Sequence, residues 1–139
     1  MLSSNLFIYL VQNKRIHYAS LMSKITVYLD NCVYKRPFDN QNSIKIRLES
    51  EAKLFIQEQI KDNQINLVWS SVNEYENNDN PSPEKRERIK AWKNIAVKRC
   101  SLNDYILNQA LYLKSSGLIA NDALHIASVI FSKRRYPSI

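Results

Sequence analysis

The arrangement that most restricts the fold of this chain is a pair of short apolar runs separated by a helical stretch. Ile25–Leu29 ("ITVYL") and Ile65–Ser70 ("INLVWS") are rich in β-branched and aromatic residues, which is typical of buried strands. Between them, Ser43 is placed to cap a helix that runs to about Asp62. Strands that alternate with helices are typical of a parallel sheet built from crossovers, and we expect that arrangement here.

The helix that follows Ser43 has apolar residues at steps of three and four, so we expect one face of it to pack on the sheet. The residues of that predicted inner face are Ile44, Leu48, Ala52, Phe55, Ile56 and Ile60.

Four more helices are predicted after the second strand. Ser71 caps the first of them, with Glu74 at the capping-box position. The second begins at Ser82 and Pro83, by the preferences for helix caps and first turns. It is expected to carry three apolar side chains inward, Ile89, Trp92 and Ile95. Ser101 starts a helix that reaches about Leu113 and is closed by Gly117, and "NDALHIASVIFSKRR" forms the last helix.

These elements predict one α/β domain with a parallel sheet in a chain of 139 residues, 45% of them hydrophobic. A single Gly argues against a barrel or sandwich with many tight turns. We expect residues 1–22 to be an N-terminal extension outside the domain, residues 23–132 to be the domain, and residues 133–139 to be a short basic tail. Pro37 and Asp39 predict a loop after the first strand.

The charge distribution leaves a nucleic-acid function open. The formal net charge is +7, but most of the excess lies outside the segment from Asp30 to Asp122, which contains all 13 acidic residues. Within that segment, Glu84–Arg99 carries seven Lys or Arg against two Glu. This run fits a surface for a polyanion and the solvated face of a helix equally well.

The other compositional signals concern cellular context. Cys32 and Cys100 are too few for a disulfide framework, so we expect reduced thiols in a cytoplasmic protein. The apolar run Leu6–Val11 is too short to cross a bilayer and lacks the features of a signal peptide, so no membrane association is expected.

Acidic residues occur at three places where an α/β sheet can bring side chains together. Asp30 ends the first strand, Glu74 and Glu76 follow the second, and Asp122 opens the last helix. Carboxylates that converge without Cys or His favour Mg²⁺ or Mn²⁺. Each acid also has a structural explanation, as a strand stop, a capping residue, a solvated side chain or a partner of the helix dipole.

Two polar neighbours have open roles. Asn31 follows the first acid and would either bind a water of the metal site or cap a turn. His125 lies three residues after Asp122 on the same predicted helix, where a hydrogen-bonded histidine is the favoured role over proton transfer.

Three segments together resemble the PIN domain: "VYLDNCVYKRPFDNQ", "SSVNEYENNDNPSPEKRERI" and "LIANDALHIASVIF". The resemblance implies a three-layer α/β/α fold and a metal-dependent ribonuclease that hydrolyses RNA phosphodiester bonds with one or two Mg²⁺ or Mn²⁺ ions, leaving a 5′-phosphate. It assigns the catalytic and metal-binding acids to Asp30, Glu76 and Asp122, with Glu74 as the fallback for the second acid and Asn31 in support. Many proteins of this family are toxins of toxin–antitoxin pairs, which implies RNA, an antitoxin and a homodimer as partners.

The end of the chain departs from the family pattern. The family continues past this helix into another strand and a further acid, whereas this sequence reads "SKRRYPSI". We therefore expect a truncated fold in which the last strands are missing and Ile25–Leu29 becomes an edge. Leu6–Val11 is then a candidate to pair with that edge. The alternative function is a catalytically impaired PIN remnant that acts only as a protein- or nucleic-acid-binding module.

Overall fold

A four-stranded sheet forms the centre of the computed structural model, which describes residues 8–10, 24–35 and 41–133. The strand order is β1 (Ile8–Leu10), β2 (Ile25–Leu29), β3 (Ile65–Ser70) and β4 (Lys98–Cys100). β3 runs parallel to both β2 and β4, whereas β1 is antiparallel to β2. The predicted α/β class with a parallel sheet is confirmed.

β1 lies against the edge of β2 that was predicted to be open. Ile8 pairs with Leu29 and Leu10 with Val27, so the prediction that this apolar run pairs with the edge is confirmed for Ile8–Leu10. β2 is therefore an interior strand. The sheet includes three residues of the segment 1–22, which we expected to lie outside the domain; the rest of that segment is outside the described residues.

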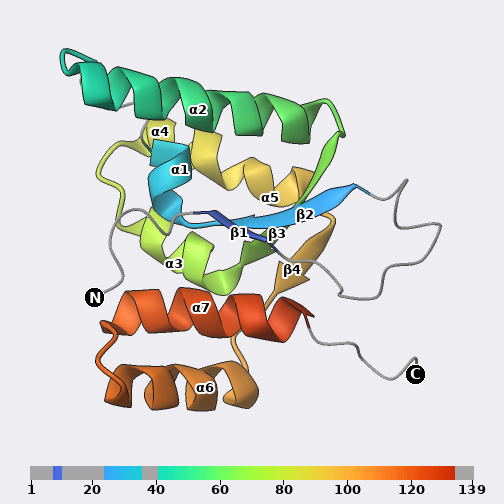
Figure 1. Cartoon of the computed structure of the whole chain (residues 1–139), viewed down its shortest axis with the longest axis vertical. Coiled ribbons are helices and arrows are strands. Elements are labelled where there is room, and N and C mark those ends of the chain that lie inside the picture. The colour runs from blue at the N-terminus through green and yellow to red at the C-terminus, as the bar shows by residue number, and fades with distance from the viewer. Residues whose placement is uncertain (1–7, 11–23, 36–40, 134–139) are drawn as a thin grey trace.

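Helices cover both faces of the sheet (Figure 1). α1 (Asn31–Lys35), α2 (Ile44–Lys61), α4 (Pro83–Lys90) and α5 (Trp92–Ile95) lie on one side, and α2 is the outermost of them. α3 (Ser71–Asn78) and α7 (Ala120–Lys133) lie on the other side, with α6 (Asp104–Ser115) beyond α7. This is the expected order of helix, sheet and helix layers, with one extra helix on the outside.

Alternate residues of β2 and β3 supply the two cores, because successive side chains of a strand point to opposite faces. Val27, Leu29, Leu67 and Trp69 pack against α1, α2, α4 and α5 through Val33, Tyr34, Ile60, Ile89 and Trp92. Tyr28 and Val68 face the other way, toward Cys100 and Val129. A third cluster joins α6 to α7 through Ile106, Ala110, Ala123 and Ala127.

The predicted inner face of α2 is only partly correct: Ile60 is in the core and Ile56 packs against it. Three of its apolar residues are largely exposed: Ile44, Leu48 and Phe55. Besides Ile60, the side turned to the protein buries three polar residues, Ser50, Lys53 and Gln57. The Gln57 amide donates a hydrogen bond to the carbonyl of Val33 at 2.9 Å, so polar contacts fix the rotation of this helix.

Several helix boundaries also differ from prediction. Ser70, not Ser71, caps α3, and its capping-box partner is Asn73 rather than Glu74. Asn103, not Ser101, caps α6. Ser43 occupies the N-cap of α2 without a side-chain hydrogen bond. The caps at Ser82 and the positive φ of Gly117 are as predicted.

The helix predicted after Ser82 breaks at Ala91 into α4 and α5, and Ile95 at its end is 42% exposed rather than buried. α1 and β4 were not predicted. Glu84–Arg99 therefore spans two helices and a strand instead of one helix face. Several of its basic side chains bind protein groups: Arg86 the Asn80 carbonyl, Arg88 Glu84, Lys93 Glu74, Lys98 the Ser132 carbonyl and Arg99 the Lys93 carbonyl.

The predicted loop at Pro37 and Asp39 and nearly all of the basic tail lie outside the described residues. Within the described part of the chain, no strand follows α7. No helix there combines the length and apolar character needed to cross a membrane.

Candidate functional site

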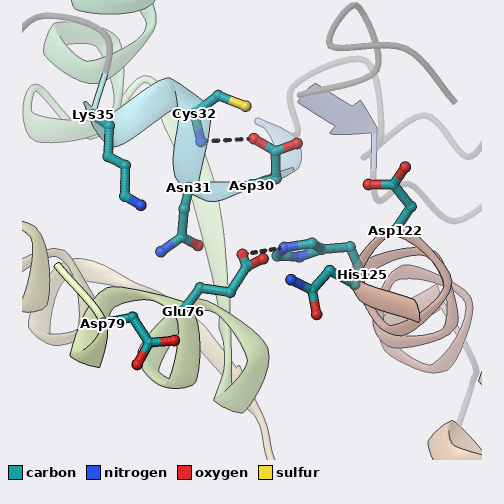
Figure 2. Close-up of a pocket in the computed structure, with 9 residues that line it drawn as sticks. Asp30, Asn31, Cys32, Lys35, Glu76, Asp79, Asp122 and His125 are labelled. Atoms are coloured by element: carbon teal, nitrogen blue, oxygen red, sulfur yellow. Dashed lines mark hydrogen bonds and ion pairs between the residues drawn. The ribbon is translucent and has the colours of Figure 1, made fainter. Parts of the chain in front are cut away.

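A cavity of about 460 Å³ opens where β2 and β3 end. In parallel sheets this is the usual position of ligand sites, because the loops and helix starts that follow the strands converge there. Figure 2 shows that its lining side chains come from α1 and the residue before it, from α3 and its C-cap residue, and from the start of α7. The lining residues are Asp30, Asn31, Cys32, Lys35, Glu76, Asp79, Asn121, Asp122 and His125.

The structure brings the three predicted acids to this one cavity. Asp30 follows β2 directly, Glu76 lies on α3 after β3, and Asp122 lies in the first turn of α7. Glu74, the fallback for the second acid, is not among the lining residues; it forms an ion pair with Lys93 at 3.2 Å. Asp79 and Lys35 line the cavity but were not predicted as site residues.

Asp30 directly precedes the N-terminus of α1. Its Oδ1 accepts a hydrogen bond from the backbone N–H of Cys32 at 2.9 Å. Burial raises the pKa of the Asp30 carboxyl above its usual value, and the negative charge of Glu76 raises it further. The hydrogen bond from Cys32 and the charge of His125 oppose this rise without cancelling it. Asp30 is thus a desolvated acid beside another acid, an arrangement that a cation would stabilise.

Glu76 is oriented by a buried chain of hydrogen bonds. His125 Nε2 lies 2.6 Å from Glu76 Oε1, and His125 Nδ1 lies 2.6 Å from the Tyr28 hydroxyl. The same hydroxyl lies 2.7 Å from Ser70 Oγ. Burial raises the pKa of Tyr28 well above its usual value, so this phenol stays protonated.

These contacts assign the tautomer of His125 when its ring is neutral. An ionised carboxylate can only accept, so Nε2 donates to Glu76. Nδ1 then accepts from the Tyr28 hydroxyl. His125 is buried and hydrogen-bonded through both ring nitrogens, as predicted, and one of its partners is a candidate catalytic acid.

Asn73 joins the ends of the two central strands, β2 and β3. Its amide donates to the Leu29 carbonyl and to Asn31 Oδ1, both at 2.9 Å. Its Oδ1 accepts from the backbone N–H of Ser70 at 3.0 Å, while Ser70 Oγ accepts from the Asn73 N–H. Asn31 returns a bond from its own amide to the Asn73 carbonyl. Asn31 therefore pairs with Asn73 rather than capping a turn.

Sequence reasoning missed Asn73, although its signal was present. Ser70 and Asn73 have the spacing of an N-cap and its third helical residue, one position before the pair that we predicted. The contact between His125 and Glu76 was harder to predict, because the two residues are 49 positions apart in the sequence.

The three carboxylates are chemically suited to bind a hard divalent cation, because carboxylate oxygens are the ligands preferred by Mg²⁺ and Mn²⁺. Within residues 8–10, 24–35 and 41–133, however, no three His, Cys, Asp or Glu side chains are grouped closely enough to hold an ion. Glu76 is bonded to His125 and Asp30 to the Cys32 N–H, and Figure 2 shows the Asp122 carboxylate set apart from both. Ion binding by Glu76 would therefore compete with its bond to His125.

Comparisons of the chain with protein-family models, curated proteins and solved structures gave no match.

Replacing Tyr28 with Phe is expected to lower the free energy of unfolding by about 1–3 kcal/mol, because buried His125 Nδ1 would lose its donor. Urea denaturation of the two proteins measures the difference. Tyr34→Phe is the matched control: Tyr34 is also buried, but its hydroxyl has no hydrogen-bond partner among the described residues. Equal effects of the two substitutions would contradict the role given to the Tyr28 hydroxyl.

Proposed function

We propose that this protein is a metal-dependent ribonuclease of the PIN type, acting as the toxin of a toxin–antitoxin pair. The observation that carries the proposal is the meeting of Asp30, Glu76 and Asp122, from three separate segments, in one cavity at the carboxyl ends of parallel strands. The resemblance of the segments around these residues to the PIN domain supports the same activity.

In this proposal, Asp30, Glu76 and Asp122 would hold Mg²⁺ or Mn²⁺ after their carboxylates move closer together than they lie in this structure. A bound ion of this kind supplies Lewis acidity and lowers the pKa of water. Lys35 brings an ammonium group to the same cavity and is suited to bind an RNA phosphate. His125 and Tyr28 hold the Glu76 carboxylate in place through the hydrogen bonds described above.

A second candidate function is a binding module without catalysis. It is favoured by the bond between Glu76 and His125, and by the separation of Asp122 from the other two carboxylates. The net charge of +7 would then serve to bind RNA or an acidic partner.

Cleavage of a labelled RNA by the purified chain, measured with Mg²⁺, with Mn²⁺ and with EDTA, distinguishes the two functions. Ribonuclease activity is expected only with a divalent ion, and Asp122→Asn should lower it by roughly 10²-fold or more. Asp104→Asn is the matched control, because Asp104 occupies the first turn of α6 and is not among the residues that line the cavity.

The results of this assay distinguish the ribonuclease from the binding module. RNA binding that weakens with salt, without cleavage under any metal condition, would support the binding module. Cleavage that persists in EDTA or in the Asp122→Asn protein would contradict the proposed site.

A further inference from the structure

The bond between His125 and Glu76 is short and largely shielded from water. His125 Nε2 lies 2.6 Å from Glu76 Oε1, with 4% of the His125 side chain and 21% of the Glu76 side chain exposed. A hydrogen bond to a charged group is stronger than one between neutral groups. Glu76 is therefore kept on the side of the cavity where His125 lies, as the dashed line in Figure 2 shows.

The ring of His125 is also fixed from its other side. Its Nδ1 lies 2.6 Å from the Tyr28 hydroxyl, and the two rings meet edge to face with their centroids 5.6 Å apart. Ser70 Oγ lies 2.7 Å from the same hydroxyl. Tyr28 and Ser70 belong to β2 and β3, so the ring is tied to the centre of the sheet. His125 consequently cannot follow Glu76 when Glu76 moves toward an ion.

Glu76 and Asp122 lie at different positions along the axis of α7. Asp122 is three residues before His125, which corresponds to a rise of about 4.5 Å along a helix. Glu76 is bonded at the later of these two positions. In the part of the chain that the structure describes, no three His, Cys, Asp or Glu side chains are close enough together to hold an ion. To share an ion with Asp122, Glu76 must move toward the start of α7 and away from His125.

We propose that His125 is a latch that holds Glu76 away from the ion of this site. The latch presupposes the metal site proposed above, and it makes the affinity of that site depend on a residue that would not itself bind the ion. In the metal-free protein, the Glu76 carboxylate is satisfied by His125. Binding of Mg²⁺ or Mn²⁺ requires that this bond be broken, so the affinity for the ion is lowered by the free energy of the bond.

The opposite role for His125 predicts the opposite result. A hydrogen bond from a neighbouring residue commonly orients a carboxylate that binds a metal, and loss of such a partner weakens metal binding by about 10- to 100-fold. Loss of a latch strengthens metal binding instead. The sign of the change in affinity therefore distinguishes a latch from a supporting residue.

Titration of the full chain with Mn²⁺ in the absence of RNA tests the proposal, with the free ion measured by electron paramagnetic resonance. His125→Leu is expected to lower the dissociation constant for Mn²⁺ by roughly 10-fold or more, the factor that one hydrogen bond to a charged group contributes. His125→Gln keeps an N–H that can donate to Glu76, so its dissociation constant should stay close to that of the unmodified protein. Circular dichroism and thermal melts without metal establish that both variants fold.

Ser128→Ala is the matched control on α7. Ser128 is buried like His125, but its hydroxyl donates to the Leu124 carbonyl at 2.8 Å, so the dissociation constant for Mn²⁺ should not change. Tyr28→Phe is a milder variant that leaves His125 in place and removes the hydroxyl that anchors its ring. It should lower the dissociation constant about threefold, because a hydrogen bond within a network weakens when its neighbour is lost.

Weaker or unchanged Mn²⁺ binding by a folded His125→Leu protein would overturn the latch while leaving the proposed ribonuclease intact. If His125→Leu does not fold, weaker or unchanged binding by Tyr28→Phe has the same meaning. Equal strengthening by Ser128→Ala would show that any change in α7 is sufficient, which also overturns the latch. If neither the unmodified protein nor the variants bind Mn²⁺, the proposed metal site is wrong, and the latch with it.

Discussion

Asp30→Asn is expected to abolish ribonuclease activity while making the protein more stable. The substitution removes a carboxylate from the cavity, and cleavage should fall by roughly 10²- to 10³-fold, the range seen when one preorganised electrostatic group is lost. Added Mn²⁺ should not restore it. Asn keeps an oxygen that can accept from the Cys32 N–H, so the local backbone should be retained.

The gain in stability follows from the direction of the pKa shift. Burial raises the pKa of Asp30 in the folded protein, so its ionised form opposes folding above that pKa, and the opposition disappears when the carboxyl is protonated in both states. At pH 7 the melting temperature of Asp30→Asn should exceed that of the unmodified protein. The difference should shrink toward zero below about pH 4, near the ordinary pKa of an Asp side chain.

Thermal melts of both proteins between pH 4 and pH 8 measure this difference, and the cleavage assay is run on the same samples. A fall in melting temperature at pH 7 would contradict the electrostatic account of Asp30. Full activity in a stabilised Asp30→Asn protein would contradict its catalytic role and leave the electrostatic account intact.

Asn73→Ala is expected to cause the largest loss of stability from a single polar side chain. The substitution would leave the Leu29 carbonyl, the Ser70 N–H and Asn31 Oδ1 without a partner that each has in the native protein. A buried group left unsatisfied costs about 1–3 kcal/mol, so the free energy of unfolding should fall by about 3 kcal/mol or more. This corresponds to a melting temperature lower by roughly 10 °C.

Asn77→Ala provides the comparison for this measurement. Asn77 lies one turn later on α3 and is equally buried, but the bond found for its amide goes only to the Arg86 carbonyl. Chemical denaturation should show a cost near 1 kcal/mol for Asn77→Ala. Similar costs at the two positions would show that Asn73 does not hold the ends of β2 and β3 together.

The sheet and the meeting of the acids could be predicted from the sequence for a simple physical reason. β2 and β3 are mostly apolar runs, and residues that follow parallel strands must converge whatever the details of packing. Asp30 needed only this rule, whereas the choice of Glu76 over Glu74 came from the resemblance to the PIN domain. Asp122 needed the further expectation that its helix returns to the same edge.

Helix rotation was not predictable in the same way. The apolar spacing of α2 indicated a helix correctly, but the side of it that faces the sheet is set by bonds such as that from Gln57 to the Val33 carbonyl. Such bonds join residues far apart in sequence. The contacts of His125 with Tyr28 and Glu76 are of the same kind, and so is the tie made by Asn73. The spacing of apolar residues within one helix contains no information on hydrogen bonds between residues that are far apart in the sequence.

The antiparallel strand β1 changes the order in which the sheet can assemble during synthesis. β2 pairs with β1 through residues only 17 to 21 positions apart, whereas its parallel pairing with β3 joins residues 40 positions apart. Contacts that close short loops form sooner than those that close long ones. A growing chain can therefore form a β1–β2 hairpin before β3 has left the ribosome, and β3 then adds to an edge that is already in place.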